Sequence, residues 1–253
     1  MNIFKEIFGR IWAAWGAIWF LVTMVVIVLI PAAVTHFMKE PRGSRIFLAF
    51  SRAWIAVFLY GVGCPMRVYG KENYDKSKLY VVTANHQSFL DVPLFCPFFP
   101  GPNKTIAKSN FAKIPVFNIV YTRGSVLVDR SSEKSRRQSM QKMKDVLEKQ
   151  HLNMALFPEG TRNRSAKPLK EFYDGAFRLA VDCKKDIMPV VMLHTAYALP
   201  PNKTFFMQPH HVEMHVLPAI SSAGKSSREL REEVFLVMWD FVEKSDNKRL
   251  LTK

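Results

Sequence analysis

The sequence is poor in cysteine and in acidic side chains, and both shortages restrict what the protein can be. Only three cysteines occur in 253 residues, Cys64, Cys96 and Cys183, far apart and without a CxxC pair. This spacing supports neither a disulfide framework nor a thiolate metal site, so we expect a reducing compartment. The 21 Asp and Glu stand against 36 Lys and Arg, which gives a formal net charge of +15. That excess predicts an anionic partner, which can be nucleic acid, an anionic membrane surface or a phosphorylated substrate.

The chain also lacks internal repeats, heptad series and low-complexity tracts, and its length predicts one domain or one domain plus an anchor. Charge is unevenly spread, since residues 1–66 carry six basic and two acidic side chains, whereas residues 67–253 carry 30 and 19. We therefore divide the chain into an apolar membrane anchor of two helices, 1–66, and a basic catalytic domain, 67–253.

The first apolar segment is long enough to cross a bilayer. No charged residue occurs from Ile11 to Thr35, and at about 1.5 Å per residue such a helix spans a hydrocarbon core of roughly 30 Å. It is too long for a signal-peptide core and no small-x-small cleavage site follows, so we expect it to be retained. Trp12, Trp15 and Trp19 share one helical face, as expected for aromatic side chains at headgroup level.

A second apolar segment, Ile46–Met66, is interrupted by Arg52 and contains Gly61, Gly63 and Pro65. It is short for an independent span, so the two segments form either a hairpin or a pair of helices inserted from one face of the membrane. Basic residues flank both sides of the first segment, so the distribution of positive charge gives no clean orientation.

Beyond Arg67 short β-rich runs alternate with helical stretches, which predicts an α/β domain with a mixed sheet flanked by helices. A charged helix is expected over Ser132–Gln150, and Ser226 with Glu229 can form a capping box for a C-terminal helix. The predicted strands are Leu79–Thr83, Thr105–Ala107, Ser125–Val128, Met154–Phe157, Ile187–Leu193 and Val212–Leu217.

A histidine and an aspartate follow the first of these strands at a useful spacing. His86 comes just after the strand, and Asp91 lies five residues later across a short turn into a helix. A carboxylate there can hold the imidazole ring, select its tautomer and raise the basicity of its outer nitrogen. Such a pair can deprotonate an alcohol, although the spacing by itself is common in proteins.

Three other strand ends carry cations. Lys108 follows one strand, Arg130 follows the next, and Gly160 and Arg162 lie in the FPEGTR segment after a third. Glycine allows close approach of a ligand to the backbone, and arginine offers a planar fork of donors that matches phosphate oxygens. Because ligands collect at the carboxyl ends of strands in open α/β sheets, these cations are expected beside His86.

The order of segments NHQSFLD, AKSNFAKIPVFN, VLVDR, FPEGTRNRS and IMPVVML resembles the glycerolipid acyltransferase family, and within it the 1-acyl-sn-glycerol-3-phosphate acyltransferases. The similarity covers about Met66–Leu193. It implies that His86 is the base and Asp91 its orienting partner, that Lys108 contacts the phosphate or developing negative charge, and that Pro189 shapes the acyl or acyl-donor site. The residues implied to bind the acceptor phosphate are Arg130, Glu159, Gly160, Thr161 and Arg162.

The resemblance also implies the reaction. An acyl chain moves from a thioester, acyl-CoA or acyl-carrier protein, to the free hydroxyl of lysophosphatidic acid, giving phosphatidic acid in phospholipid biosynthesis. It implies no metal and no cofactor, the acyl thioester being a co-substrate. The expected partners are anionic membrane lipids and, as an alternative donor, acyl-carrier protein docked on a basic helix face. A membrane protein with its catalytic domain on the cytoplasmic face is expected.

Several alternatives stay open at this stage. His210, His211 and His215 suggest a metal site, but in a strand His211 and His215 would lie roughly 13 Å apart, which disfavours zinc. A membrane-tethered basic protein that binds nucleic acid or acts as a scaffold is disfavoured, because it would need cations interleaved with exposed aromatics, whereas the key cations here follow strand ends. A closer rival is an acyltransferase for another acceptor, such as glycerol 3-phosphate, another lysophospholipid or a lyso-ornithine lipid.

Overall fold

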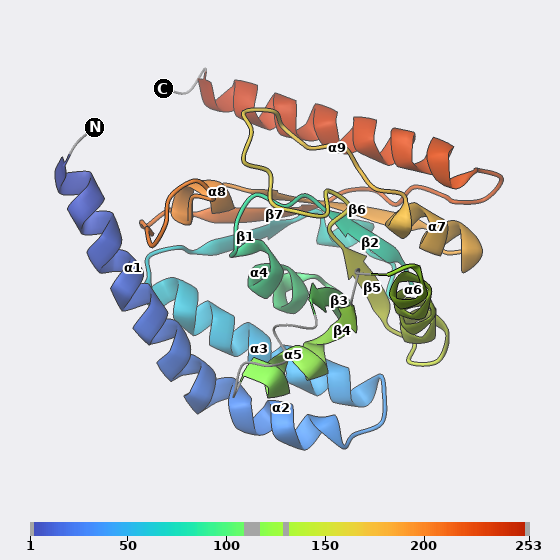
Figure 1. Cartoon of the computed structure of the whole chain (residues 1–253), viewed down its shortest axis with the longest axis horizontal. Coiled ribbons are helices and arrows are strands. Elements are labelled where there is room, and N and C mark those ends of the chain that lie inside the picture. The colour runs from blue at the N-terminus through green and yellow to red at the C-terminus, as the bar shows by residue number, and fades with distance from the viewer. Residues whose placement is uncertain (1–2, 109–116, 129–131, 251–253) are drawn as a thin grey trace.

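A seven-stranded mixed sheet forms the centre of the protein (Figure 1). The computed structural model describes residues 3–108, 117–128 and 132–250, and the strand order within them is β1-β7-β6-β2-β5-β3-β4. Neighbouring strands are parallel except for β6 and β7, which pair antiparallel. The strands are β1 Met66–Tyr69, β2 Val81–Ala84, β3 Asn103–Lys108, β4 Ser125–Val128, β5 Asn153–Leu156, β6 Ile187–Leu193 and β7 Val212–Val216.

The predicted α/β class and mixed sheet are confirmed. All six predicted strands form, with boundaries that differ by at most two residues. The strand β1 was missed, because its four residues adjoin the apolar anchor and alternate between half-buried and exposed positions. It pairs in parallel with β7 and closes the far edge of the sheet.

Helices cover both faces of the sheet. The charged helix predicted to start near Ser132 forms, and the Ser132 side chain accepts a hydrogen bond from the Ser135 N–H. The predicted capping box also forms, since the Glu229 carboxylate accepts from the backbone N–H and hydroxyl of Ser226. The helices are α1 Ile3–Thr23, α2 Leu29–His36, α3 Arg42–Gly61, α4 Asp91–Phe98, α5 Phe117–Gly124, α6 Glu133–Glu148, α7 Gly175–Asp182, α8 Thr195–Ala198 and α9 Ser227–Leu250, with a π-helical turn Met24–Val28 and a 3-10 turn Lys71–Asn73.

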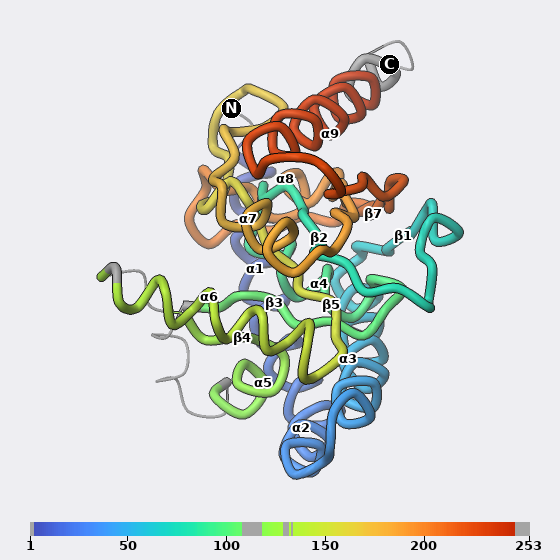
Figure 2. The backbone as a smooth tube through the Cα atoms, turned by 90° about the vertical axis from the view of Figure 1, so that its right-hand side faces the viewer, coloured from blue at the N-terminus to red at the C-terminus, as the bar shows by residue number. Residues whose placement is uncertain are grey.

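Alternating strand residues supply two hydrophobic cores. Val82 and Val190 pack into the core on the side of α1, α3 and α4, whereas Val81 and Val191 pack into the core under α6, α7 and α9. Figure 2 shows the consequence, with α9 at one end of the molecule and α2 and α3 at the other. The N-terminal helices therefore share a core with the sheet.

The N-terminal helix presents an apolar surface to the outside. By length and composition, Ile3–Ile27 could cross a membrane, and among the described residues it is the single helix that passes this test. Large side chains along it are exposed, including Phe4 at 84% and Val26 at 73%. Pro31 lies just after the π-helical turn, where its missing N–H removes one helical hydrogen bond and accounts for the local irregularity.

Three tryptophans of α1 donate hydrogen bonds to carbonyls at and near the C-terminal end of α3. The indole N–H groups of Trp12 and Trp15 donate to the carbonyls of Val62 and Gly61 at 3.0 and 2.9 Å, and that of Trp19 donates to Val57 at 3.3 Å. The prediction that these rings lie at headgroup level stays a prediction, but their N–H groups are used within the protein. A Cβ atom at Gly61 would lie 1.9 Å from the Trp19 Nε1, so only glycine permits this contact.

A buried ion-pair group ties the connector between α2 and α3 to the catalytic domain. The carboxylate of Glu40 pairs with Arg123 of α5 and, at 3.1 Å, with Lys104 of β3. Burial alone would raise the pKa of Glu40, but these cations and the Ser44 hydroxyl lower it from 4.5 to about 2. The residues predicted as anchor and as catalytic domain thus share a buried electrostatic contact.

Candidate active site

The predicted His–Asp pair forms at the carboxyl end of β2. The His86 Nδ1 lies 2.8 Å from the Asp91 Oδ2, and the same oxygen accepts from the backbone N–H groups of Gln87 and Ser88 at 2.6 and 2.7 Å. Asp91 is completely buried at the first turn of α4, where backbone N–H groups favour a negative charge. Because this carboxylate oxygen accepts three hydrogen bonds, the His86 Nδ1 carries the proton and Nε2 is left as the basic nitrogen.

Two further contacts hold the segment around His86 in place. The Asn85 amide donates to the Met192 carbonyl at 2.9 Å and accepts from the Met192 N–H at 2.6 Å, which joins the ends of β2 and β6. The Ser88 hydroxyl donates to the Leu199 carbonyl at 2.8 Å. Ser88 is therefore engaged with the backbone beyond α8, as expected for a turn residue and not for a nucleophile.

Glu159 is hydrogen-bonded to the backbone of His86. Its two carboxylate oxygens accept from the backbone N–H groups of His86, at 2.7 Å, and Lys170, at 3.0 Å. Only 1% of Glu159 is exposed. Burial raises its pKa from 4.5 to about 7, although the two N–H donors act in the opposite direction. We predicted that Glu159 binds the acceptor, but its place in the structure favours a positioning role instead.

The FPEGTR segment brings cations to the same place. Gly160 has φ of 70°, a left-handed conformation that favours glycine, and the Asn163 N–H beyond it donates to the His86 carbonyl at 2.6 Å. The Arg162 guanidinium lies over the ring of Phe89, 3.4 Å from its centroid. Burial, together with the neighbouring Arg164, lowers the pKa of Arg162, but a guanidinium remains charged at neutral pH.

A cavity of about 1230 Å³ opens beside His86. Its polar wall contains His86, Arg162, Arg164 and Lys170, whereas the N-terminal helices contribute an apolar wall that includes Phe20, Trp54 and Phe58. A ligand that fits both walls has an anionic group and a long apolar part.

The structure brings most of the predicted residues to this cavity. Gly160, Thr161 and Arg162 line it together with His86, and Asp91 supports the ring from below. Two predicted residues are not placed, since Arg130 and the side chain of Lys108 lie outside the described residues. Pro189 is buried in the middle of β6 and is not among the described residues that line the cavity.

Three residues of the site were not predicted from the sequence. The Lys170 ammonium lies 2.7 Å from the Thr161 hydroxyl and lines the cavity, Phe89 carries Arg162, and Asn85 joins two strands. A lysine eleven residues after Glu159 belongs to no local motif, because its position depends on the path by which the loop comes back to the active site. The position of Asn85 next to His86, directly after a strand, was the one usable hint.

Comparison with known proteins finds a matching family model and several similar proteins. A family model described as Acyltransferase matches residues 65–193, just over half of the chain. The chain is 30% identical over 170 residues to the 1-acyl-sn-glycerol-3-phosphate acyltransferase alpha of Mus musculus, covering 67% of this chain and 59% of that protein. It is also 30% identical over 158 residues to the 1-acyl-sn-glycerol-3-phosphate acyltransferase of Saccharomyces cerevisiae, covering 62% and 52%. The chain thus spans little more than half the length of these relatives.

A solved structure matches over nearly the whole chain. The 1-acyl-sn-glycerophosphate (LPA) acyltransferase PlsC from Thermotoga maritima superposes with a TM-score of 0.77, at 22% identity, over 96% of this chain and 98% of that one. At this identity the likeness concerns the fold alone. It includes the N-terminal helices as well as the sheet, because so little of either chain is left uncovered.

Proposed function

This chain belongs to the acyltransferase family, and from that premise we propose that it transfers an acyl chain from acyl-CoA or acyl-carrier protein to 1-acyl-glycerol-3-phosphate, forming phosphatidic acid. The observation that carries this proposal is the His86–Asp91 pair at a cavity with both cationic and apolar walls. A lysophospholipid presents a phosphate, a free hydroxyl and an acyl chain, which correspond to the cations, the base and the apolar wall.

The geometry supports a direct transfer. The His86 Nε2 removes the proton from the acceptor hydroxyl as its oxygen attacks the thioester carbonyl, and the buried carboxylate of Asp91 stabilises the imidazolium. Collapse of the tetrahedral intermediate breaks the C–S bond, and the imidazolium returns the proton to the departing thiolate. A new ester and a free thiol result, and neither a metal nor a covalent acyl-enzyme is required.

Arg162 and Lys170 are the described cations best placed for the acceptor phosphate. Both line the cavity with His86, and Lys170 is held through the Thr161 hydroxyl. Guanidinium binds phosphate through paired hydrogen bonds, while ammonium acts as a compact charge. Arg130 and Lys108 remain predicted contributors.

We further propose that the apolar surface of α1 inserts into a membrane and that the catalytic domain faces the cytoplasm, where acyl thioesters are available. The exposed apolar side chains of α1 support insertion. The remaining positive charge of the chain would hold the domain against anionic headgroups, at about 1 kcal/mol for each well-placed cation. No nucleic-acid partner is proposed, and acyl-carrier protein is a partner only if it is the donor.

A panel assay of the purified protein tests this function. Each acceptor, lysophosphatidic acid, other lysophospholipids, glycerol 3-phosphate and a lyso-ornithine lipid, is offered with acyl-CoA or acyl-carrier protein. We expect turnover with lysophosphatidic acid and a loss of about 10² to 10⁴ in rate for His86→Ala. Turnover restricted to an acceptor without phosphate, or an unchanged rate in His86→Ala, would contradict the proposal.

A further inference from the structure

Three histidines gather at a place that the acyl-transfer chemistry does not use. His194 directly follows β6, while His210 and His211 directly precede β7. The ring centroids of His194 lie 5.5 Å from His210 and 4.7 Å from His211, and those of His210 and His211 lie 4.7 Å apart. One candidate ligand atom from each of the three lies within 4.8 Å of the other two.

The geometry points to a divalent transition-metal site, and we propose that His194, His210 and His211 bind one Zn²⁺ ion. Imidazole nitrogen is a preferred zinc ligand, with Zn–N distances of about 2.0–2.1 Å, so tetrahedral ligand nitrogens lie roughly 3.4 Å apart. The observed separations therefore require the nitrogens to approach by no more than about 1.4 Å, which rotation of half-buried or exposed rings can supply. His211 is exposed, so solvent can supply a fourth ligand.

A hydrogen bond at the cluster selects the nitrogen of His210 that suits metal binding. The Nδ1 of His210 lies 2.7 Å from the carbonyl of His211, which can only accept, so Nδ1 carries the proton and Nε2 is the ligand atom. The Nε2 of His211 lies 3.7 Å from the Glu213 carboxylate, beyond hydrogen-bonding distance. A metal-binding histidine commonly directs its other nitrogen to a carboxylate or backbone carbonyl in this way.

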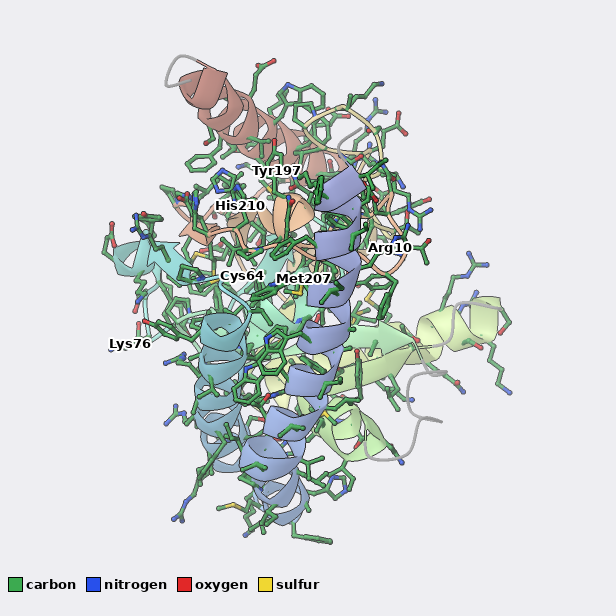
Figure 3. The ribbon with its side chains drawn as sticks, turned by 90° about the vertical axis from the view of Figure 1, so that its left-hand side faces the viewer. Arg10, Cys64, Lys76, Tyr197, Met207 and His210 are labelled. Atoms are coloured by element: carbon green, nitrogen blue, oxygen red, sulfur yellow. The ribbon has the colours of Figure 1, made fainter. Side chains whose placement is uncertain are left out.

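His194 is held in an unusual backbone conformation. Its φ is 68°, in the left-handed region, and its carbonyl accepts from the Tyr197 N–H at 2.9 Å to begin α8. Tyr197 in turn stacks on His210, with ring centroids 5.3 Å apart, and these two residues lie side by side in Figure 3. The backbone therefore turns sharply at the point where His194 must face the other two rings.

The site lies at the two ends of one segment, residues 194–211, which contains α8 and borders the active site. Within this segment Phe206 and Met207 line the cavity, and the Met207 N–H donates to the Gly9 carbonyl of α1 at 3.0 Å. The ring of Phe206 leaves no room for a Cβ atom at Gly9. A metal that binds the three rings only in the folded arrangement would stabilise this segment and, through it, the docking of α1 against the catalytic domain.

From the sequence, a different set of three histidines was considered as a zinc site and disfavoured. It joined His210 and His211 to His215, which lies in β7 and instead contacts Glu213 at 2.8 Å. His194 is distant in sequence, and only the antiparallel pairing of β6 with β7 brings it to the other two. The trio considered from the sequence did not include His194.

Zinc titration of the full chain, purified in detergent without a polyhistidine tag and stripped with EDTA, tests the site. We expect one Zn²⁺ per chain by competition with a chromogenic chelator, and a tetrahedral Co²⁺ absorption spectrum. His194→Asn, which tolerates the left-handed backbone, and His211→Gln should each weaken binding by at least about 100-fold, because even loss of an outer hydrogen-bond partner costs 10- to 100-fold. The unfolding temperature should rise with Zn²⁺ and not with Mg²⁺.

Matched controls separate this site from others. His36→Gln and His151→Asn change histidines away from the cluster and should leave zinc affinity unchanged. Each cluster variant should also keep the unfolding temperature of the metal-free wild type, which shows that it folds. Failure of the wild type to bind one Zn²⁺, or equal affinity in His194→Asn and wild type, would overturn the proposal. Because metal binding is measured directly, this result does not depend on whether the proposed acyl transfer is correct.

Discussion

The buried carboxyl of Glu159 should make the stability of this protein depend on pH. Its folded pKa is about 7, against 4.5 when exposed. Between these values the folded state binds more protons than the unfolded state, so the free energy of unfolding falls as pH rises from 4.5 to 7 and then levels off. At about 1.4 kcal/mol per pKa unit, the full contribution is about 3 kcal/mol.

Replacing Glu159 by glutamine removes this titration. The amide stays neutral at all pH values, but it offers a single acceptor to the two backbone N–H groups, of His86 and Lys170, that the carboxylate serves. Leaving one buried donor without an acceptor costs about 1–3 kcal/mol at every pH. The variant should therefore be less stable than the wild type near pH 5 and equal or more stable near pH 8, where the wild type carries the cost of a buried charge.

Chemical denaturation in one detergent at pH 5, 6, 7 and 8 measures the effect. The difference in unfolding free energy between wild type and Glu159→Gln should change by about 3 kcal/mol across this range. Glu171→Gln, at an exposed position nearby, is the matched control and should follow the wild type. A difference that stays constant with pH would refute the reasoning, because it would mean that Glu159 titrates normally in the folded protein.

Three further predictions follow from the same geometry. Asp91→Asn should lower the acyl-transfer rate by about 10² to 10⁴. The control Asp75→Asn, at an exposed turn, should stay within about twofold of the wild-type rate. A loss of less than about 10² for Asp91→Asn would argue against the assignment of His86 as the base. Phe89→Leu should raise the KM for lysophosphatidic acid about two- to fivefold, which corresponds to the loss of an exposed cation–π contact. Phe89→Tyr keeps a ring under Arg162 and should keep the wild-type KM. An equal rise in KM for both variants would exclude a role for that contact. Glu40→Gln should lower the unfolding temperature at pH 7, and the gap should shrink as pH falls below 4.5 toward the folded pKa of about 2; a gap independent of pH would contradict the ion-pair explanation.

The sequence allowed the sheet and the catalytic pair to be predicted, for physical reasons. Strands such as Ile187–Leu193 are buried on both faces and appear as continuous apolar runs. His86 and Asp91 are five residues apart, so a single local turn joins them. Features defined within one short segment are visible in the sequence.

Features that depend on distant segments could not be predicted in the same way. Lys170 reaches the site only because its loop returns across Glu159, and His194 meets His210 only through the pairing of two strands. The short edge strand Met66–Tyr69 has no pattern strong enough to separate it from the apolar segment before it. Charge and hydropathy also suggested an anchor separate from the domain, whereas the two share a core.

The indole contacts at the end of α3 have a consequence for how far the parts of this protein can be exchanged. The carbonyls of Gly61 and Val62 come at the end of a helix, where no further turn supplies N–H donors, and Trp15 and Trp12 supply them instead. An unrelated apolar helix of the same length would preserve the hydropathy of α1 but would leave these carbonyls without the indole donors. The N-terminal helix therefore cannot be replaced by an arbitrary apolar helix, because its tryptophans complete the hydrogen bonding at the C-terminal end of α3.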